Sequence, residues 1–180
     1  MFKSVKNNKG FTLIELLAVI VIMGVLMMVA IPQVTKYINN SRKDAYVETA
    51  KAYINGARYM LLNDEYEDCS LSQTSANLIT FNNISVESGG DKSGYGRDII
   101  KTKSYVKVEY DGDKMKYKYS VFIVDALGNT VAAAKGQTTA VEEVALSRKS
   151  VQQKSYNQTS VAGISLPSQA TCTKMNKDAE

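Results

Sequence analysis

Histidine is absent from the 180 residues, and cysteine and proline occur only twice each. Without histidine the chain lacks the side chain that most often serves as a general base and as a metal ligand. The sequence also shows no acid-base constellation near a nucleophile. We therefore expect a protein that is not an enzyme and that holds neither a metal nor a cofactor.

Positive charge is concentrated at the N-terminus. The formal net charge is +4, but Lys3, Lys6 and Lys9 lie in a first ten residues that contain no acid. The rest of the chain holds 19 basic and 18 acidic residues, a net charge of +1. This balance provides no basic stripe of the kind that binds nucleic acid, so nucleic acid is not an expected partner.

The most informative segment is a long apolar run near the N-terminus. No charged residue occurs between Leu16 and Thr35. As a helix this run covers about 30 Å, the thickness of the hydrocarbon core of a bilayer. The lysines before it favour a cytoplasmic N-terminus, which places residues 36–180 outside the membrane.

Three simpler interpretations compete with a specialised membrane helix. A secretory signal peptide has a shorter apolar core and a small-x-small cleavage site, which only Met28-Val29-Ala30 approximates. A plain single-span anchor and a buried core helix are the other two. A plain anchor accounts for everything except Glu15, a carboxylate inside the apolar segment.

Glu15 needs an explanation because a carboxylate inside a bilayer costs about 2.5–3.5 kcal/mol on insertion scales. No cation follows it within one helical turn. Cleavage between Gly10 and Phe11 would create one, the free amino group of Phe11.

Residues Lys9-Gly10-Phe11-Thr12-Leu13-Ile14-Glu15 resemble the class III leader and cleavage site of type IV prepilins and the related pseudopilins. The resemblance covers about residues 3–40. It implies that a prepilin peptidase cuts after Gly10 and that Phe11 becomes the N-methylated terminus. It also implies assembly roles for Glu15, for Gly24 in mid-helix and for Pro32.

We expect Glu15 to pair with the Phe11 amine of a neighbouring subunit, because one helix places its own terminus poorly for this contact. Two unit charges about 4 Å apart attract by roughly 4 kcal/mol at an effective dielectric constant of 20. Such a pair would set the axial register of each subunit. Gly24 and Pro32 weaken the helix between them, and we hypothesise that it melts there on polymerisation.

The helix is expected to continue beyond the membrane, from about Thr12 to Asn63. Apolar residues recur at helical spacing after Tyr37, and polar residues occupy the opposite positions. The stripe comprises Tyr46, Val47, Ala50, Tyr53, Ile54, Ala57, Met60 and Leu61. A coiled-coil seam is the rival interpretation, but two heptads are few.

The second part of the chain predicts a small antiparallel sheet. Residues 64–103 read as a long surface connection rich in Ser, Asn and Gly. Alternation then predicts strands at 104–110, 115–125 and 130–132, with a turn at Asp111-Gly112-Asp113. We read those aspartates as turn residues and not as calcium ligands. On the middle strand Tyr117, Tyr119, Val121 and Ile123 should face the helix.

The C-terminal region carries weaker signals. Residues 138–149 fit a short helix better than a strand, and the remainder is expected to be loop-like, with Ile164, Leu166 and Pro167 as anchors. Cys69 and Cys172 form a candidate disulfide, because cysteines outside the membrane meet an oxidising environment. The bridge differs from that of many type IV pilins, in which it is confined to the C-terminal part.

These observations predict an α+β type IV pilin fold, a long N-terminal helix packed on a small antiparallel β-sheet. The expected parts are a leader (1–10), a transmembrane and assembly half (11–35), an amphipathic half (36–63), a loop (64–103) and a sheet head (104–180).

The expected function is that of a structural subunit, a major pilin, whose precursor spans the cytoplasmic membrane and whose mature form enters an extracellular fibre. Its expected partners are other copies of itself, prepilin peptidase, the membrane assembly platform, the lipid bilayer before assembly, and host or abiotic surfaces. The resemblance implies adhesion, motility, aggregation or DNA uptake as roles. The alternatives are a pseudopilin of a type II secretion or competence system, and a membrane-anchored binding module that never polymerises.

Overall fold

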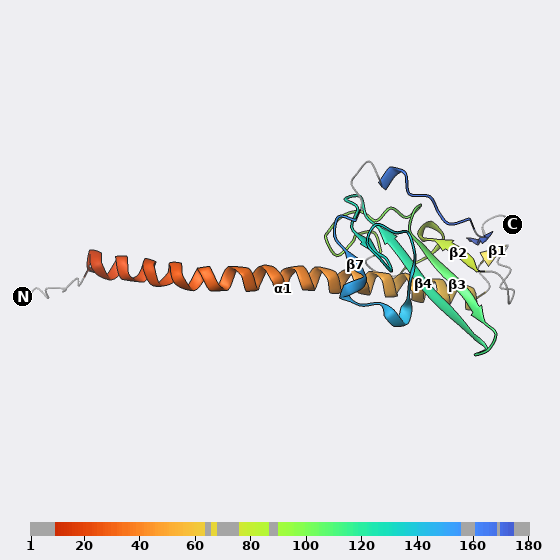
Figure 1. The fold of residues 1–180 in the computed structure, drawn as a ribbon, viewed down its shortest axis with the longest axis horizontal. Coiled ribbons are helices and arrows are strands. Elements are labelled where there is room, and N and C mark those ends of the chain that lie inside the picture. The colour runs from red at the N-terminus through yellow and green to blue at the C-terminus, as the bar shows by residue number, and fades with distance from the viewer. Residues whose placement is uncertain are drawn as a thin grey trace, which may run out of the picture. The chain divides into compact units, whose positions relative to one another are not determined.

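The computed structural model describes residues 10–63, 66–67, 76–86, 90–155, 161–168 and 170–174. The chain divides into two units, Met1–Asn39 and Asn40–Glu180, and each is described by itself. The second unit is called the head below. The helix α1, Leu13–Leu62, contributes its first part to the first unit and its last part to the head (Figure 1).

In the first unit, the apolar side chains of α1 are exposed along its whole length. An 18-residue window reaches a mean hydropathy of 2.9, and no residue of that window is buried. By length and composition this helix is able to cross a membrane. It remains α-helical through Gly24 and Pro32. The predicted melting concerns the assembled fibre and stays a prediction.

In the head, the last part of α1 buries the expected stripe. Tyr46, Val47, Ala50, Tyr53, Ile54, Ala57 and Met60 are all buried, and Leu61 packs against the same cluster while remaining partly exposed. The helix ends at Leu62, one residue before the predicted end. Burial on one face and polar residues on the other confirm the amphipathic interpretation.

The sheet of the head is larger than the three strands expected. Among the described residues the sheet has seven strands: six follow the order β7-β5-β4-β3-β2-β8, and the seventh, β6, pairs with β4 off this path. Their bounds are β2 Asn77–Thr80, β3 Tyr105–Asp111, β4 Lys116–Val124, β5 Thr130–Val131, β6 Val141–Glu142, β7 Val151–Gln152 and β8 Ala170–Thr171. The strands β1, Tyr66–Glu67, and β9, Thr173–Lys174, form a separate antiparallel pair.

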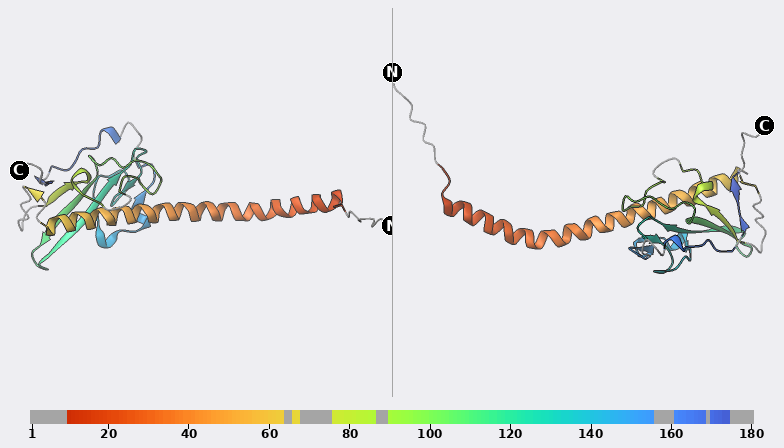
Figure 2. Two further views of the ribbon diagram at one scale, coloured as in Figure 1. Left: turned by 180° about the vertical axis from the view of Figure 1, so that it is seen from behind. Right: turned by 90° about the horizontal axis from the view of Figure 1, so that it is seen from above.

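The predicted meander is present. β3 pairs antiparallel with β4, with Val106 opposite Val121, and β4 pairs antiparallel with β5. Both strands cross the part of α1 that belongs to the head (Figures 1 and 2). Tyr119, Val121 and Ile123 join the helix stripe in one cluster, as expected. Tyr117 is 44% exposed, so its predicted burial is wrong; it lies near the hairpin end, beside Tyr110.

The other face of the sheet is also buried, which the sequence did not suggest. Leu78, Tyr105, Phe122 and Val124 form a second cluster with Ala132, Val161 and Ile164. The Lys103 ammonium group donates hydrogen bonds to the carbonyl oxygens of Val161 and Ala162, at 2.6 and 2.5 Å. The C-terminal segment expected to be loop-like is therefore a cover for this face, with Ile164 as one of its anchors.

Two further expectations differ from the structure. The segment 64–103 is not only a surface connection, because it supplies β2 and the buried Phe81, Ile84 and Ile99. The predicted helix at 138–149 is wrong. The segment forms β6 and two 3₁₀ turns, Glu143–Ala145 and Arg148–Ser150. Val141 pairs opposite Val121, whereas Val144 is 90% exposed, so no single helical face would have been buried.

Candidate functional site at the start of the long helix

The peptide bond between Gly10 and Phe11 lies outside regular structure. Residues 10–12 have no helical or strand assignment, and Gly10 and Phe11 are exposed, Phe11 to 91%. Open space surrounds Gly10, where an added Cβ would meet no atom within 4 Å. Exposed, irregular backbone is the kind of segment that proteases reach. The leader residues 1–9 lie outside the described residues.

Thr12 and Glu15 close the first turn of α1 as a capping box. The amide nitrogen and the hydroxyl of Thr12 both donate to Glu15 Oε2, at 2.8 Å each. The Glu15 amide donates in return to the Thr12 hydroxyl at 3.3 Å. The two side chains thus satisfy backbone donors that every helix start leaves without partners.

This contact was not predicted from the sequence, and the expected pairing of Glu15 with the Phe11 amine of a neighbouring subunit stays a prediction. The Thr-x-x-Glu spacing from Thr12 to Glu15 is a recognised capping signature, so the sequence contained the signal. The capping box leaves the negative charge in place, because Thr12 carries none. Glu15 Oε1 accepts no hydrogen bond from the described residues, so this oxygen stays open to a cation.

Gly24 and Pro32 lie in the exposed apolar part of α1. An added Cβ on Gly24 would meet nothing within 4 Å, so this glycine is not required by packing inside the subunit. Pro32 has no amide hydrogen, and the carbonyl oxygen of Met28 therefore lacks its usual helical donor. The Thr35 hydroxyl donates to the Ile31 carbonyl at 3.0 Å. Both residues thus lie on an exposed surface of the helix, and their expected roles in assembly stay predictions.

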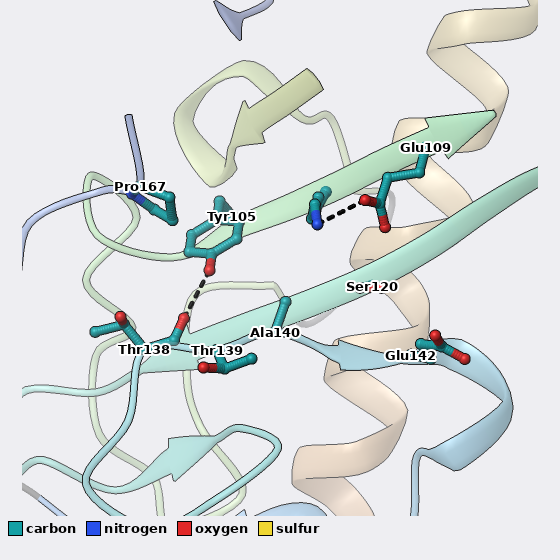
Figure 3. Close-up of a pocket in the computed structure, with 9 residues that line it drawn as sticks. Tyr105, Glu109, Ser120, Thr138, Thr139, Ala140, Glu142 and Pro167 are labelled. Atoms are coloured by element: carbon teal, nitrogen blue, oxygen red, sulfur yellow. Dashed lines mark hydrogen bonds and ion pairs between the residues drawn. The ribbon is translucent and has the colours of Figure 1, made fainter. Parts of the chain in front are cut away.

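The head carries a polar hollow on the sheet face that lies away from α1. It has a volume of about 310 Å³ and is bounded by β3, β4 and the segment leading into β6 (Figure 3). The Tyr105 hydroxyl donates to the Thr138 carbonyl at 2.6 Å, and Lys107 pairs with Glu109 at 2.7 Å. Three of its polar side chains, those of Tyr105, Lys107 and Glu109, are thus engaged by neighbouring protein groups.

The loop around Gly90 and Ser93 and the turn at Asp111 have structural roles. The Gly90 carbonyl accepts from the Tyr53 hydroxyl at 2.6 Å, and Ser93 Oγ donates to Asp125 at 2.8 Å. Asp111 accepts from the Lys114 amide and pairs with Lys118, as expected for a turn residue. Among the described residues, no group of three or more His, Cys, Asp or Glu side chains is placed to hold a metal ion.

The candidate disulfide stays a prediction. Cys172 is buried, and its amide donates to the Leu78 carbonyl at 2.9 Å. The Asn83 side chain donates to the Cys172 carbonyl at 3.1 Å. Cys69 lies outside the described residues.

Comparison with known proteins supports the pilin resemblance. Residues 5–31 match the family described as Prokaryotic N-terminal methylation motif. A type IV major fimbrial protein FimA from Dichelobacter nodosus is 38% identical over 73 residues, which cover 40% of this chain and 47% of the relative. Another FimA from the same organism is 33% identical over 100 residues, which cover 53% of this chain and 62% of the relative.

The matches thus span about half to three fifths of the length of these relatives. No solved structure matches the chain significantly. The methylation motif, the two fimbrial relatives and the long apolar helix with a small, mainly antiparallel sheet are the features in which the chain is similar to type IV pilins.

Proposed function

We propose that the chain is cut after Gly10 and polymerises through the first part of α1 into an extracellular type IV pilus. The observation that carries this proposal is the combination of an exposed apolar helix with one carboxylate at its start. More than twenty large apolar side chains of the chain are exposed, most of them between Phe11 and Ile38. Such a surface needs lipid or other helices around it.

The path from membrane to fibre follows from this surface. Before assembly the helix lies in the bilayer as a single-pass precursor. Prepilin peptidase removes residues 1–10 and methylates Phe11. The membrane assembly platform then moves the helix out of lipid and against the helices of other copies, so that apolar side chains meet apolar side chains throughout.

Glu15 supplies the specificity of that step. Its Oε1 accepts the Phe11 amino group of a neighbouring subunit while Oε2 keeps the two hydrogen bonds from Thr12. Breaking a buried ion pair by removing one partner costs about 3–5 kcal/mol. A subunit without the carboxylate therefore enters the fibre poorly.

The fimbrial names of both relatives favour a surface pilus over a pseudopilin. A pilus is long and can be sheared from cells, whereas the anchored binding module would stay in the membrane with Met1 intact.

Mass spectrometry of material sheared from cells tests the proposal. We expect fibres whose subunits begin at methylated Phe11, and Glu15→Gln should reduce fibre yield at least tenfold with normal precursor levels, from the cost of an unpaired partner. Glu48→Gln is the matched control, since Glu48 is an exposed glutamate of the same helix whose partner is Lys51. Fibres of Glu15→Gln at normal yield, or subunits that still begin at Met1, would contradict the proposal.

A further inference from the structure

Four cations lie on the first turn of α1 that belongs to the head and on two loops attached to that part of the helix. Arg42 is exposed and Lys43 partly exposed on the helix, and Arg97 and Lys154 are exposed on two loops. We call these four residues the basic collar. Arg42 lies seven residues after Thr35, the end of the charge-free run, which is about 10 Å of helix.

Contacts along the head hold the two loops at this turn of the helix. Gly94 lies directly on the backbone of Arg42 and Tyr46. The Tyr95 ring packs edge-on against Tyr46, with ring centroids 6.2 Å apart. Burial raises the pKa of Tyr95, and the nearby Arg42 charge opposes that shift. Arg97 belongs to the same loop, since the Ser93 amide donates to the Arg97 carbonyl at 2.7 Å.

The second loop reaches the same place from the other side. Gln153 Nε2 donates to the Tyr95 hydroxyl at 2.9 Å. The Lys154 amide donates to Asn129 Oδ1 at 3.0 Å, and the Tyr46 hydroxyl donates to the Asn129 carbonyl at 3.2 Å. Lys154 thus projects from a turn that is fixed to Tyr46 through Asn129.

The acids near the basic collar already have partners. Asp44 is held by both nitrogens of the Arg148 fork, at 2.5 and 2.7 Å, and Asp98 pairs with Lys92 at 3.3 Å. Asp125 is fully buried and accepts from Ser93 and Asn129. Among the ion pairs of the described residues, none involves a member of the basic collar, so no described acid neutralises its positive charge by direct pairing.

We propose that the basic collar binds the anionic headgroups of the bilayer in which the precursor helix lies. The proposal rests on the membrane stage of the proposed function. Headgroups extend about 5–8 Å beyond the hydrocarbon core on each side. The Arg42 backbone, about 10 Å beyond the charge-free run, therefore lies just outside that layer, and a long basic side chain can reach back to it. Each basic side chain near an anionic surface strengthens binding by about fivefold.

A second copy of the head is a less suitable partner for the basic collar. The β3–β4 hairpin and the adjoining Glu142 of β6 together carry four acids and four bases, so their charges balance. The acids are Glu109, Asp111, Asp113 and Glu142, and the bases are Lys107, Lys114, Lys116 and Lys118. This surface has no excess of negative charge to offer.

The bound collar has a consequence for assembly. Contacts with anionic lipid hold the head at the membrane surface and must be broken before the helix leaves the bilayer. The collar therefore couples lipid charge to the release of the subunit.

Hydrogen exchange of the full-length chain in nanodiscs tests the proposal. We compare nanodiscs of phosphatidylcholine with nanodiscs that contain phosphatidylcholine and phosphatidylglycerol in equal amounts. Exchange at residues 93–98 should be at least about fivefold slower in the anionic nanodiscs, and high salt should remove the difference.

Matched variants locate the effect. Arg97→Gln with Lys154→Gln should abolish the slowing, whereas Lys114→Gln with Lys116→Gln, which removes two exposed charges from the hairpin, should preserve it. Equal exchange of the wild-type chain in both lipids overturns the proposal. So does slowing of the same size by inorganic phosphate in phosphatidylcholine nanodiscs, or by added head of a second chain. Protection of residues 16–35 in both lipids shows separately that the helix has inserted, so failure of the membrane stage is distinguishable.

Discussion

Gly94 lies so close to Arg42 that a methyl group on the glycine would overlap the Arg42 carbonyl oxygen. The loop and the helix therefore meet backbone to backbone. We expect Gly94→Ala to destabilise the head by about 3 kcal/mol, because neither backbone can move aside cheaply. Denaturant unfolding in micelles, followed by tyrosine circular dichroism, measures this loss. Gly112→Ala is the control, since its added Cβ meets nothing within 4 Å; equal stability of the two variants would refute the packing argument.

Asp125 is buried at the turn after β4 and accepts four hydrogen bonds. Its Oδ1 accepts from the amides of Leu127 and Asn129, each at 2.9 Å. Its Oδ2 accepts from Ser93 Oγ and Asn129 Nδ2, each at 2.8 Å.

We expect Asp125→Asn to lower the free energy of unfolding by about 3 kcal/mol. The asparagine NH₂ group replaces one carboxylate oxygen, so two hydrogen-bond donors would then face each other. The same unfolding assay measures the change, with the exposed Asp113→Asn as control. A loss below about 1 kcal/mol, the size of one ordinary hydrogen bond, would show that the network is dispensable.

The Asp44–Arg148 contact makes stability depend on acid pH. The Arg148 side chain donates to Asp44 and so lowers the pKa of that carboxyl below 3.8. A lowered pKa means that the contribution is present above pH 3.8 and is lost as pH falls through the folded value. Arg148→Gln should remove this acid-side dependence. NMR titration of Asp44 checks it, and an unchanged titration curve in the variant would argue against the contact.

Tyr53 makes stability depend on alkaline pH in the opposite sense. Burial raises the pKa of Tyr53 from 10.0 to about 12. The neutral phenol is the form that the folded head favours, so its contribution is complete below pH 10.0 and is lost as pH rises towards about 12. Tyr53→Phe should flatten this loss, as followed by unfolding at increasing pH. Tyrosinate absorbance that is complete near pH 10.0 in the folded wild type would contradict the buried hydroxyl.

The capping box predicts a local effect at the start of α1. Thr12→Val removes the hydroxyl that serves Glu15 and should destabilise the first turn by about 1 kcal/mol. Thr12→Ser retains the hydroxyl and should retain the turn. Amide exchange at residues 13–16 in micelles distinguishes them. If both variants exchange alike, the hydroxyl does not secure the helix start.

Local patterns in the sequence were sufficient to predict the elements that are marked by helical spacing or by strand alternation. The stripe from Tyr46 to Met60 repeats at helical spacing, and the structure buries every member of that range that was expected inside. β3, β4 and β5 appear within one or two residues of their predicted bounds, because alternation and a turn signal act between neighbours in the chain. The Gly10-Phe11 motif and Glu15 can likewise be recognised from the sequence. The Thr12 cap also has a local signal, the Thr-x-x-Glu spacing, which the prediction did not use.

Long-range pairing decided the rest. Val141 joins β4 instead of a helix because its partner Val121 lies twenty residues earlier in the chain, and no local pattern records that distance. β2 and the cover formed by Val161 and Ile164 depend in the same way on surfaces that exist only once β3 and β4 have paired. The sequence by itself determined the long helix, its apolar half and its motif, since these need only neighbours within a few residues. Only the tertiary structure decided three features: the contact of the Gly94 loop with α1, the hydrogen bonds of the buried Asp125, and the set of residues in the basic collar. Each of these features is assembled from segments that are far apart in the chain.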